Sequence, residues 1–575
     1  MNSRYLGLVR LPAAAALAAA LLSACGGGGG GGGGAPPPPT VTISGRITFD
    51  RIPFDTVLNN GLNPAIVVNS PARQVTVQAI AATGQTVLAT GTTDSSGNYS
   101  LSVPSNTSLF IRARAEMIKT DAAPTWNFSV RNNTTAGTND ALYAIDGSPA
   151  SSGAANSTRD LNAPTGFGTN SYTGERAAAP FAILDTVFRA KELVLTATPN
   201  AAFPELRLFW SPNNRPTVGR FCPDDGDIGT SSYIVFANGE LDDCNKPNAD
   251  GIYVLGDFAN GSGDTDEFDQ SVIAHEFGHY VEDRFGRTDS IGGDHGGSET
   301  PLDLRVAFGE GWGNAFSAMS LGNPVYRDSQ QGMQTEFFLD LEADDDLNEG
   351  WFSEISVGEI LWDLFDATNE AGDTVALGFQ PLFAVMTGAQ VTTDALTSIF
   401  TLTSGLRVAQ PTQQPGINGL LDGEDIAGRD DFGTDETNFG GVGSAQDLLP
   451  IYRNIVRNDP AGPLTVCSRS PFGDASSNKL GNRVFLRFTN DVQRLVTITV
   501  NGDNSGGGVP ATDPDIFVLR RGALAAFGVG NTLGTETISQ APLPAGVFII
   551  EVYDFAIDTV VSPLPRCMTV SVTGN

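Results

Sequence analysis

The histidines of this chain constrain its fold more than any other feature. There are three, and they lie within 21 consecutive residues, at His275, His279 and His295. The first two enclose the run His-Glu-Phe-Gly-His, in a proline-free stretch whose periodicity predicts a helix over about 270–286. Residues four apart share one face of a helix. Both imidazoles can therefore bind one Zn²⁺, with Glu276 beside the open coordination position.

A catalytic zinc site usually needs a third protein ligand. The phrase VAFGEGWGNAF, at 306–316, predicts a second helix, and its Glu310 is the predicted third ligand. Together these motifs resemble the gluzincins, in which a glutamate on a second helix completes a site of two histidines. They are most similar to the fungalysin branch, which shares the phrase Gly-Glu-Gly-Trp. The resemblance covers 272–316, with a fainter echo at 357–362, and implies a zincin-like α+β domain with zinc endopeptidase activity.

The chain departs from the fungalysin pattern in two ways. That family has aspartate four residues after the third ligand, where it orients a zinc-binding histidine, and this chain has Asn314. An amide oxygen can accept the imidazole N–H, but it lacks the charge that raises the basicity of the ligand. Nothing N-terminal resembles the fungalysin propeptide. A metzincin is excluded, because Glu282 and Phe285 stand where that family has glycine and histidine.

The third histidine, His295, lies in a glycine-rich stretch at 291–297 that predicts a loop. Three interpretations are open: a solvated loop histidine, a hydrogen-bond donor to the developing oxyanion as in thermolysin-like relatives, or a zinc ligand in place of Glu310. Three tyrosines are weaker candidates for the oxyanion role, because such residues are more often core or surface aromatics: Tyr253, Tyr280 and Tyr326.

The predicted reaction is peptide-bond hydrolysis by a zinc-activated water, with Glu276 as general base and then general acid. The predicted catalytic residues are thus Glu276 and His295. The strand-like run 251–256 is expected to form the cleft edge and to bind an extended protein or peptide substrate by β-augmentation. The alternative, favoured by Asn314, is a catalytically idle surface adhesin or glycan- or protein-binding lipoprotein. The predicted zinc ligands are His275, His279 and Glu310.

Residues 1–24 have the layout of a secretory signal, with two arginines, an apolar run and small residues before Cys25. The tetrapeptide Leu-Ser-Ala-Cys resembles the lipobox of bacterial lipoproteins, which implies cleavage before Cys25 and attachment of lipid to it. The linker 25–40 continues with a flexible glycine tract and a stiff proline tract. Lipid is therefore the predicted attachment to the outer membrane or cell surface. Ordinary secretion after cleavage nearby is the alternative.

Four further cysteines remain once Cys25 carries lipid. An even number in an oxidising compartment suggests disulfides, with three possible pairings. We expect one pair to close a short loop and the other to join the two ends of a C-terminal domain, the alternative being free buried thiols. No two of these cysteines have the spacing C-x2-C, which disfavours a zinc site. The predicted pairs are Cys222 with Cys244 and Cys467 with Cys567.

The flanks of the chain predict antiparallel β structure, from short alternating runs broken by turns. The turn at 93–99 resembles carboxypeptidase regulatory-like, or transthyretin-like, sandwiches. The phrases at 513–518 and 543–552 resemble the bacterial pre-peptidase C-terminal domain. We therefore predict a multidomain protein whose central α+β zincin-like domain is flanked by two β-sandwiches. The predicted divisions are a sandwich at 41–118, an irregular connector at 119–175, the central domain at 176–460 and a second sandwich at 461–575.

The charge of the chain is strongly negative, with 33 basic and 65 acidic residues and a formal net charge of -32. Such a chain repels a phosphate backbone, so nucleic acid is excluded as a partner. We expect a monomer. Three acidic runs could bind Ca²⁺ but do not fit the EF-hand spacing, and a solvated surface is the alternative for each. These runs lie at 264–269, 342–346 and 422–425.

Overall fold

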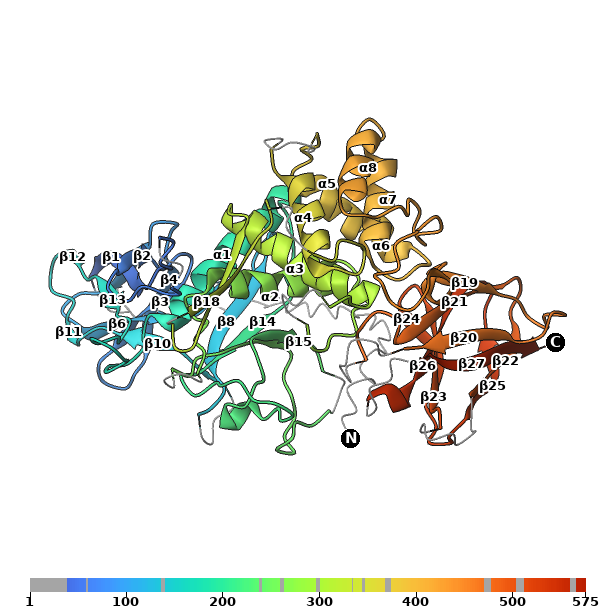
Figure 1. Ribbon diagram of the computed structural model, residues 1–575. Coiled ribbons are helices and arrows are strands. Elements are labelled where there is room, and N and C mark those ends of the chain that lie inside the picture. Colours follow the sequence, from blue (N-terminus) through green and yellow to red (C-terminus); the bar gives the residue numbers. More distant parts are fainter. Residues whose placement is uncertain are drawn as a thin grey trace, which may run out of the picture.

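The computed structural model describes residues 39–574, apart from 58–59, 136–139, 237–239, 259–262, 296–299, 334, 344–346, 368–373, 470–476, 503–510 and 559–564. The predicted signal sequence, Cys25 and most of the linker lie outside the described residues. Figure 1 shows three regions in a row: strands at one end, helices beside a sheet in the middle, and strands again at the other end. The protein is multidomain and mixed α+β. None of the described helices is long and apolar enough to span a membrane.

The N-terminal region consists of two five-stranded sheets. Its strands form because apolar and polar residues alternate, so that Tyr99, Leu101 and Val103 of β5 all face the core. The first sheet contains β1 (Thr40–Arg51), β2 (Val68–Pro71), β5 (Asn98–Pro104), β12 (Ser157–Thr158) and β13 (Leu161–Ala163). The second contains β3 (Thr76–Ala81), β4 (Val87–Thr92), β6 (Ser108–Arg114), β10 (Ala144–Asp146) and β11 (Ala150–Ser151).

The central sheet has the order β15-β16-β14-β8-β7, with β9 paired to β8. Its middle strands β8, β14 and β16 are parallel, and both edge strands are antiparallel to their neighbours. A separate hairpin joins β17 to β18. The strands are β7 (Glu116–Lys119), β8 (Trp126–Asn132), β9 (Ala141–Leu142), β14 (Leu206–Trp210), β15 (Ser232–Ile234), β16 (Gly251–Val254), β17 (Val325–Gln330) and β18 (Thr335–Asp340).

The segment 119–175 is not the irregular connector that its composition predicts. Strand β8 lies within it and is an inner strand of the central sheet, while β10 to β13 complete the N-terminal sheets. Most of these strands have only two or three residues, too few to show an alternating pattern, and they depend on long-range pairing. Side chains of the N-terminal region and of the central region also contribute to one continuous hydrophobic core.

Helices cover the central sheet, and α2 and α3 lie at their centre (Figure 1). Helix α3 begins after Asp303, whose side chain accepts a hydrogen bond from Arg305 N (3.0 Å), and it ends at Gly322, where φ is +66°. The helices are α1 (Ala179–Ala197), α2 (Gln270–Phe285), α3 (Leu304–Leu321), α4 (Glu354–Phe365), α5 (Phe379–Met386), α6 (Ala389–Thr392), α7 (Ile399–Ala409), α8 (Gln414–Gly423) and α9 (Ala445–Leu448), with short 3₁₀ turns at Pro223–Asp225 and Phe555–Asp558.

The C-terminal region consists of a five-stranded and a four-stranded sheet with a hydrophobic core of their own. Strand β19, which precedes the predicted boundary at 461, pairs with β21 and so belongs to these sheets. The strands are β19 (Tyr452–Ile455), β20 (Leu464–Ser468), β21 (Arg483–Asn490), β22 (Arg494–Gly502), β23 (Pro514–Arg520), β24 (Ala523–Gly528), β25 (Thr535–Leu543), β26 (Gly546–Asp554) and β27 (Arg566–Gly574).

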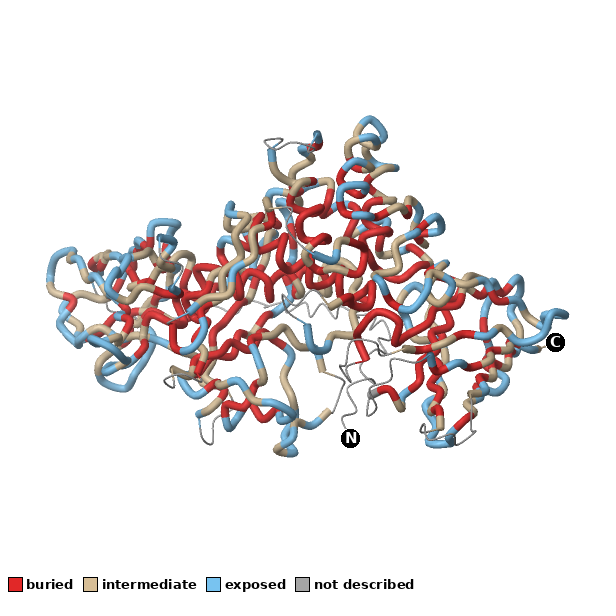
Figure 2. Tube along the Cα trace, viewed as in Figure 1, coloured by how far each residue is buried: buried red, intermediate tan, exposed pale blue. Residues whose placement is uncertain are grey.

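Both predicted disulfides are confirmed. Cys222 pairs with Cys244 across 22 residues, and Cys467 pairs with Cys567 across 100 residues. The second bond joins facing positions of β20 and β27. Disulfides are typical of extracellular or periplasmic proteins. Figure 2 shows that buried residues concentrate along the middle of the molecule, where α2 and α3 lie, while exposed residues gather on the loops at both ends.

Candidate metal centre

Helices α2 and α3 approach each other closely because glycines occupy their contact. A Cβ atom at Gly313 would lie 2.7 to 2.8 Å from ring atoms of His275, and one at Gly278 would lie 3.1 Å from the Cβ atom of Phe316. Trp312 Nε1 donates a hydrogen bond across this contact to Gly278 O (2.9 Å). The glycines of both sequence motifs thus allow the helices to bring their polar side chains together.

The three predicted zinc ligands meet at this contact. His275 Nε2 and His279 Nε2 each lie 3.2 Å from Glu310 Oε2, and the two nitrogens are 3.0 Å apart. Ligand atoms held about 2.0 to 2.1 Å from one Zn²⁺ in tetrahedral geometry are separated by about 3.3 Å. The donor types and their separations therefore fit a zinc ion. Burial would raise the pKa of Glu310, but His295 and His279 hold it well below its usual range.

Asn314 occupies the position where the resemblance implies an aspartate. Its Oδ1 lies 2.9 Å from His275 Nδ1 and can accept the N–H of that nitrogen. A proton on Nδ1 leaves the lone pair of Nε2 directed at the other two donors. The amide thus orients the imidazole for metal binding, as an aspartate would, but without adding negative charge.

Glu276 is buried and lies outside the set of three donors. Its Oε2 accepts a hydrogen bond from Tyr233 N (2.6 Å), and burial raises the pKa of Glu276 to about 7. A carboxyl group with such a pKa can both take up and release a proton near neutral pH. The geometry therefore separates a group suited to proton transfer from the groups suited to hold a metal.

The strand next to Glu276 is not the predicted one. The run 251–256 contains β16, which is flanked by β14 and β15 and is not a sheet edge. The edge strand is β15, whose Tyr233 contributes the N–H that Glu276 accepts. Strand β15 has only three residues. So short a run shows no pattern that could be preferred, from the sequence alone, to the longer run at 251–256.

The structure brings His295 to the same cluster. Its Nε2 lies 3.4 Å from Glu310 Oε2, and its Nδ1 lies 3.1 Å from Glu354 Oε2. The side chain is 34% exposed, so it is reachable from solvent while it contacts both carboxylates. Burial would lower the pKa of His295, but Glu310 and Glu354 raise it to about 10. His295, Glu310 and Glu354 form a second group whose donor atoms could share a cation.

A segment of the C-terminal region supports the loop that carries His295. Asn478 Nδ2 donates hydrogen bonds to the carbonyl oxygens of Gly292 (3.1 Å) and Asp294 (2.9 Å), and Lys479 Nζ donates to the second of these (2.7 Å). Asp303 N, at the start of α3, donates to Asn478 O (2.8 Å). The last region of the chain thus contacts both the loop and the helix of the site.

Three residues of the site have no signal in the sequence: Tyr233, Glu354 and Asn478. Tyr233 acts through its backbone, Glu354 is one of many acidic residues, and Asn478 lies far from the motifs along the chain. Among the weaker candidates, Tyr326 packs against His275 with ring centroids 5.9 Å apart. Tyr253 and Tyr280 donate hydrogen bonds to backbone carbonyl oxygens and belong to the core.

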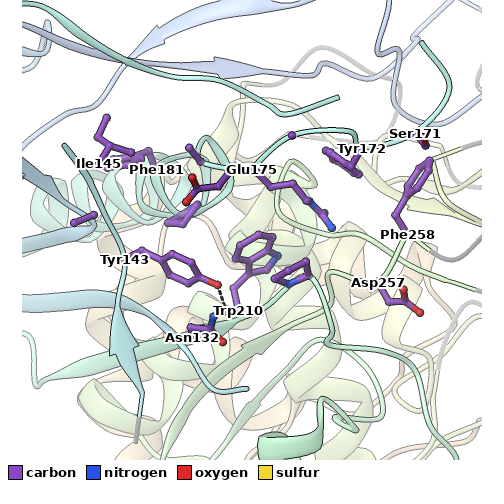
Figure 3. A pocket seen from close by; sticks show the side chains of 16 residues that line it. Asn132, Tyr143, Ile145, Ser171, Tyr172, Glu175, Phe181, Trp210, Asp257 and Phe258 are labelled. Carbon is purple, nitrogen blue, oxygen red and sulfur yellow. Dashed lines mark hydrogen bonds between the residues drawn. The ribbon is translucent and has the colours of Figure 1, made fainter. Parts of the chain in front are cut away.

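A cavity of about 600 Å³ lies apart from the candidate metal centre. Aromatic rings line it, including Tyr143, Tyr172 and Trp210, with Glu175 nearby (Figure 3). Tyr143 Oη donates a hydrogen bond to Trp210 O (3.2 Å). None of the predicted site residues contributes to its lining, so the cavity is separate from the cluster of donors.

No family model matches the chain, and no curated protein sequence matches it. Solved structures with weak similarity include the pre-peptidase C-terminal domain of a collagenase from Bacillus anthracis, at 11% identity over 21% of this chain and 93% of that one, with a TM-score of 0.15. The periplasmic g-type lysozyme inhibitor PliG of Aeromonas hydrophila has 14% identity over 21% of this chain and 96% of that one, with a TM-score of 0.13. Similarities this weak carry no argument about function.

Proposed function

We propose that this protein is a zinc-dependent endopeptidase with a zincin-like central domain. The observation that carries the proposal is the meeting of His275, His279 and Glu310, whose donor atoms lie 3.0 to 3.2 Å apart, beside a separate buried carboxyl group. A closed structural site would not need Glu276 between two of its ligands. The resemblance of both helix motifs to the gluzincins supports the same conclusion.

Bound zinc would act as a Lewis acid toward a peptide carbonyl and an attacking water. Glu276 would accept the proton of that water and then deliver it to the leaving amine, for which a pKa of about 7 is well suited. We propose that His295 donates a hydrogen bond from Nε2 to the oxygen on which charge develops, in place of its 3.4 Å contact with Glu310 Oε2, while Glu354 keeps hold of Nδ1. Asn314 orients His275.

The proposed substrate is an extended protein or peptide segment. Strand β15 forms an edge of the central sheet, and its backbone lies beside Glu276. An extended chain pairing with such an edge would bring its carbonyl groups past the catalytic carboxyl group. We further propose that the protein is exported and anchored by lipid on Cys25. The two disulfides are consistent with export.

The test is to purify the mature chain, measure its zinc content and follow cleavage of casein and of a quenched-peptide library. Glu276→Gln should keep the zinc and lose at least about 100-fold of the activity, because an amide cannot transfer the proton. The matched control is Glu205→Gln, which changes a carboxyl group that is 49% exposed and pairs with Arg207, which is not a residue of the site. Equal activity of wild type and Glu276→Gln, or absence of zinc from the active protein, would refute the proposal.

A further inference from the structure

A second cluster of oxygen donors lies just before the N-terminus of α2. Asp264 and Asp266 lie in the loop that leads into this helix, and Asp328 lies on β17. The structure brings one carboxylate oxygen of each to within 4.8 Å of the others. This cluster, which we call the triaspartate cluster, shares no residue with the candidate metal centre.

A fourth carboxylate, outside the cluster of three, is buried beside it. Asp269 immediately precedes α2 and has no exposed surface. Its Oδ2 accepts a hydrogen bond from Ser329 N (2.6 Å), which holds Asp269 against the strand that carries Asp328. Among the residues that the structure describes, its other oxygen, Oδ1, is buried and has no hydrogen-bond partner, and the same holds for Asp266 Oδ1. Buried polar atoms without a protein partner are rare in folded proteins, and a bound water or ion can satisfy those that occur.

The hydroxyl group of Thr265 provides a further oxygen of this kind. It is fully buried, has no hydrogen-bond partner within the described part of the chain, and lies between two of the cluster residues in the sequence. Among the described residues, none of the four aspartates forms an ion pair with lysine or arginine. Burial, followed by the charge of Asp328, raises the pKa of Asp269 well above its usual range. In the described ranges, four carboxyl groups therefore lie together with no lysine or arginine paired to any of them.

We propose that the triaspartate cluster, together with Asp269, binds a calcium ion. All of the donors are oxygens, which Ca²⁺ prefers, and six to eight of them surround this ion at about 2.3 to 2.6 Å. Two ligands on opposite sides of Ca²⁺ then lie about 5 Å apart, so three oxygens that all lie within 4.8 Å of one another can share one such ion. Mg²⁺ fits less well, because it demands near-octahedral geometry at about 2.0 to 2.1 Å and usually retains several waters.

The position of the site gives the ion a structural role. Asp264, Asp266 and Asp269 belong to the segment that enters α2, and Asp328 belongs to a different element. Calcium would therefore join β17 to the start of the helix that carries His275 and His279. Of the three acidic runs in the sequence, the proposed calcium site uses only the run at 264–269. Asp328 joins that run from a distant part of the chain.

The experiment uses the full mature chain, stripped of calcium with a selective chelator and supplied with zinc. Isothermal titration with CaCl₂ should reveal one site, and Ca²⁺ should raise the unfolding midpoint by several degrees, with a smaller effect of MgCl₂. Asp266→Asn and Asp328→Asn should each weaken Ca²⁺ binding at least 10-fold. The matched control, Asp422→Asn in another acidic run, has a side chain that is 70% exposed and should bind Ca²⁺ as the wild type does.

The variants also distinguish a lost ligand from a damaged fold. Replacing one carboxylate by an amide reduces repulsion among the four, so the calcium-free variants should unfold at the same temperature as the calcium-free wild type or above it. Absence of stoichiometric Ca²⁺ binding by the folded wild type would overturn the proposal. Unchanged Ca²⁺ affinity in both folded variants would do the same. These readouts do not depend on peptidase activity, so this proposal and the proposed function can fail separately.

Discussion

The contact between α3 and the C-terminal sheets gives a prediction about acid stability. Glu551 of β26 is buried between two arginines: Arg305 Nη1 lies 2.8 Å from its Oε2, and Arg483 contacts Oε1. Burial would raise the pKa of Glu551, but the two arginines lower it from an ordinary value of 4.5 to about 2. This difference corresponds to about 3 kcal/mol of folding free energy at neutral pH.

The direction of the pH dependence follows from the lowered pKa. Because the folded protein holds the carboxylate ionised more strongly than the unfolded chain does, the stabilisation is complete well above pH 4.5 and is lost as the pH falls toward 2. At pH 3, a little less than half of the roughly 3 kcal/mol should remain. Glu551→Gln cannot titrate. The difference in stability between wild type and variant should therefore be largest at pH 7 and shrink with acid.

The assay is urea-induced unfolding at pH 7 and pH 3, followed by circular dichroism. At pH 7, Glu551→Gln should lower the free energy of unfolding by about 3 to 5 kcal/mol, because it also leaves two buried arginines without their carboxylate. The other titratable groups behave alike in wild type and variant. The difference between their free energies of unfolding therefore reports on Glu551 alone. Glu205→Gln should change stability by less than about 0.5 kcal/mol at either pH. A wild-type-to-variant difference that is the same at pH 7 and pH 3 would refute the reasoning.

Two further predictions concern the metal centre. Asn314→Asp should tighten zinc binding by about 10-fold, since a carboxylate raises the basicity of His275 more than an amide does; competition with a chromogenic chelator measures this, and weaker or unchanged binding contradicts it. Gly313→Ala should weaken zinc binding at least 10-fold in the same assay, because its Cβ would lie 2.7 to 2.8 Å from atoms of the His275 ring. Gly419→Ala is its control, since a Cβ there meets nothing within 4 Å, and equal losses in both variants would count against a steric effect at the site.

The candidate site was more predictable from the sequence than its surroundings. Two histidines at helical spacing specify their own geometry, because the turn of α2 places them together without help from other elements. Glu310 required a second helix at the correct crossing, for which the glycines at 278 and 313 are the local signal. Tyr233 and Glu354 could not be predicted, since their positions depend on how β15 and α4 pack and not on any pattern of their own.

In the fold, too, local sequence patterns predict some elements, whereas others depend on packing with distant parts of the chain. Strands of the two flanks such as β5 and β22 lie where alternating runs predict them, because each buries one face and leaves the other more exposed. The segment 119–175 was wrongly predicted to be irregular. Its longest strand, β8, is seven residues long and lies between β7 and β14, and this burial in the sheet outweighs the weak preference of its polar residues. The remaining domain divisions stay a prediction.

The hydrogen bonds from Asn478 and Lys479 impose an order on how the site is completed. Residues 292–305 are synthesised long before residues 478–551. Arg305 nevertheless depends on Glu551 for its buried carboxylate partner. The loop at 292–295 depends on Asn478 and Lys479 for hydrogen bonds to its carbonyl oxygens. A nascent chain that ends near residue 450 already contains every proposed zinc donor but lacks the hydrogen bonds of Asn478 and Lys479 to the loop that carries His295. The site is therefore complete only after these late residues have been synthesised and folded. A shortened chain would test whether the proposed donors bind zinc, but it would not test the site with its supporting loop contacts.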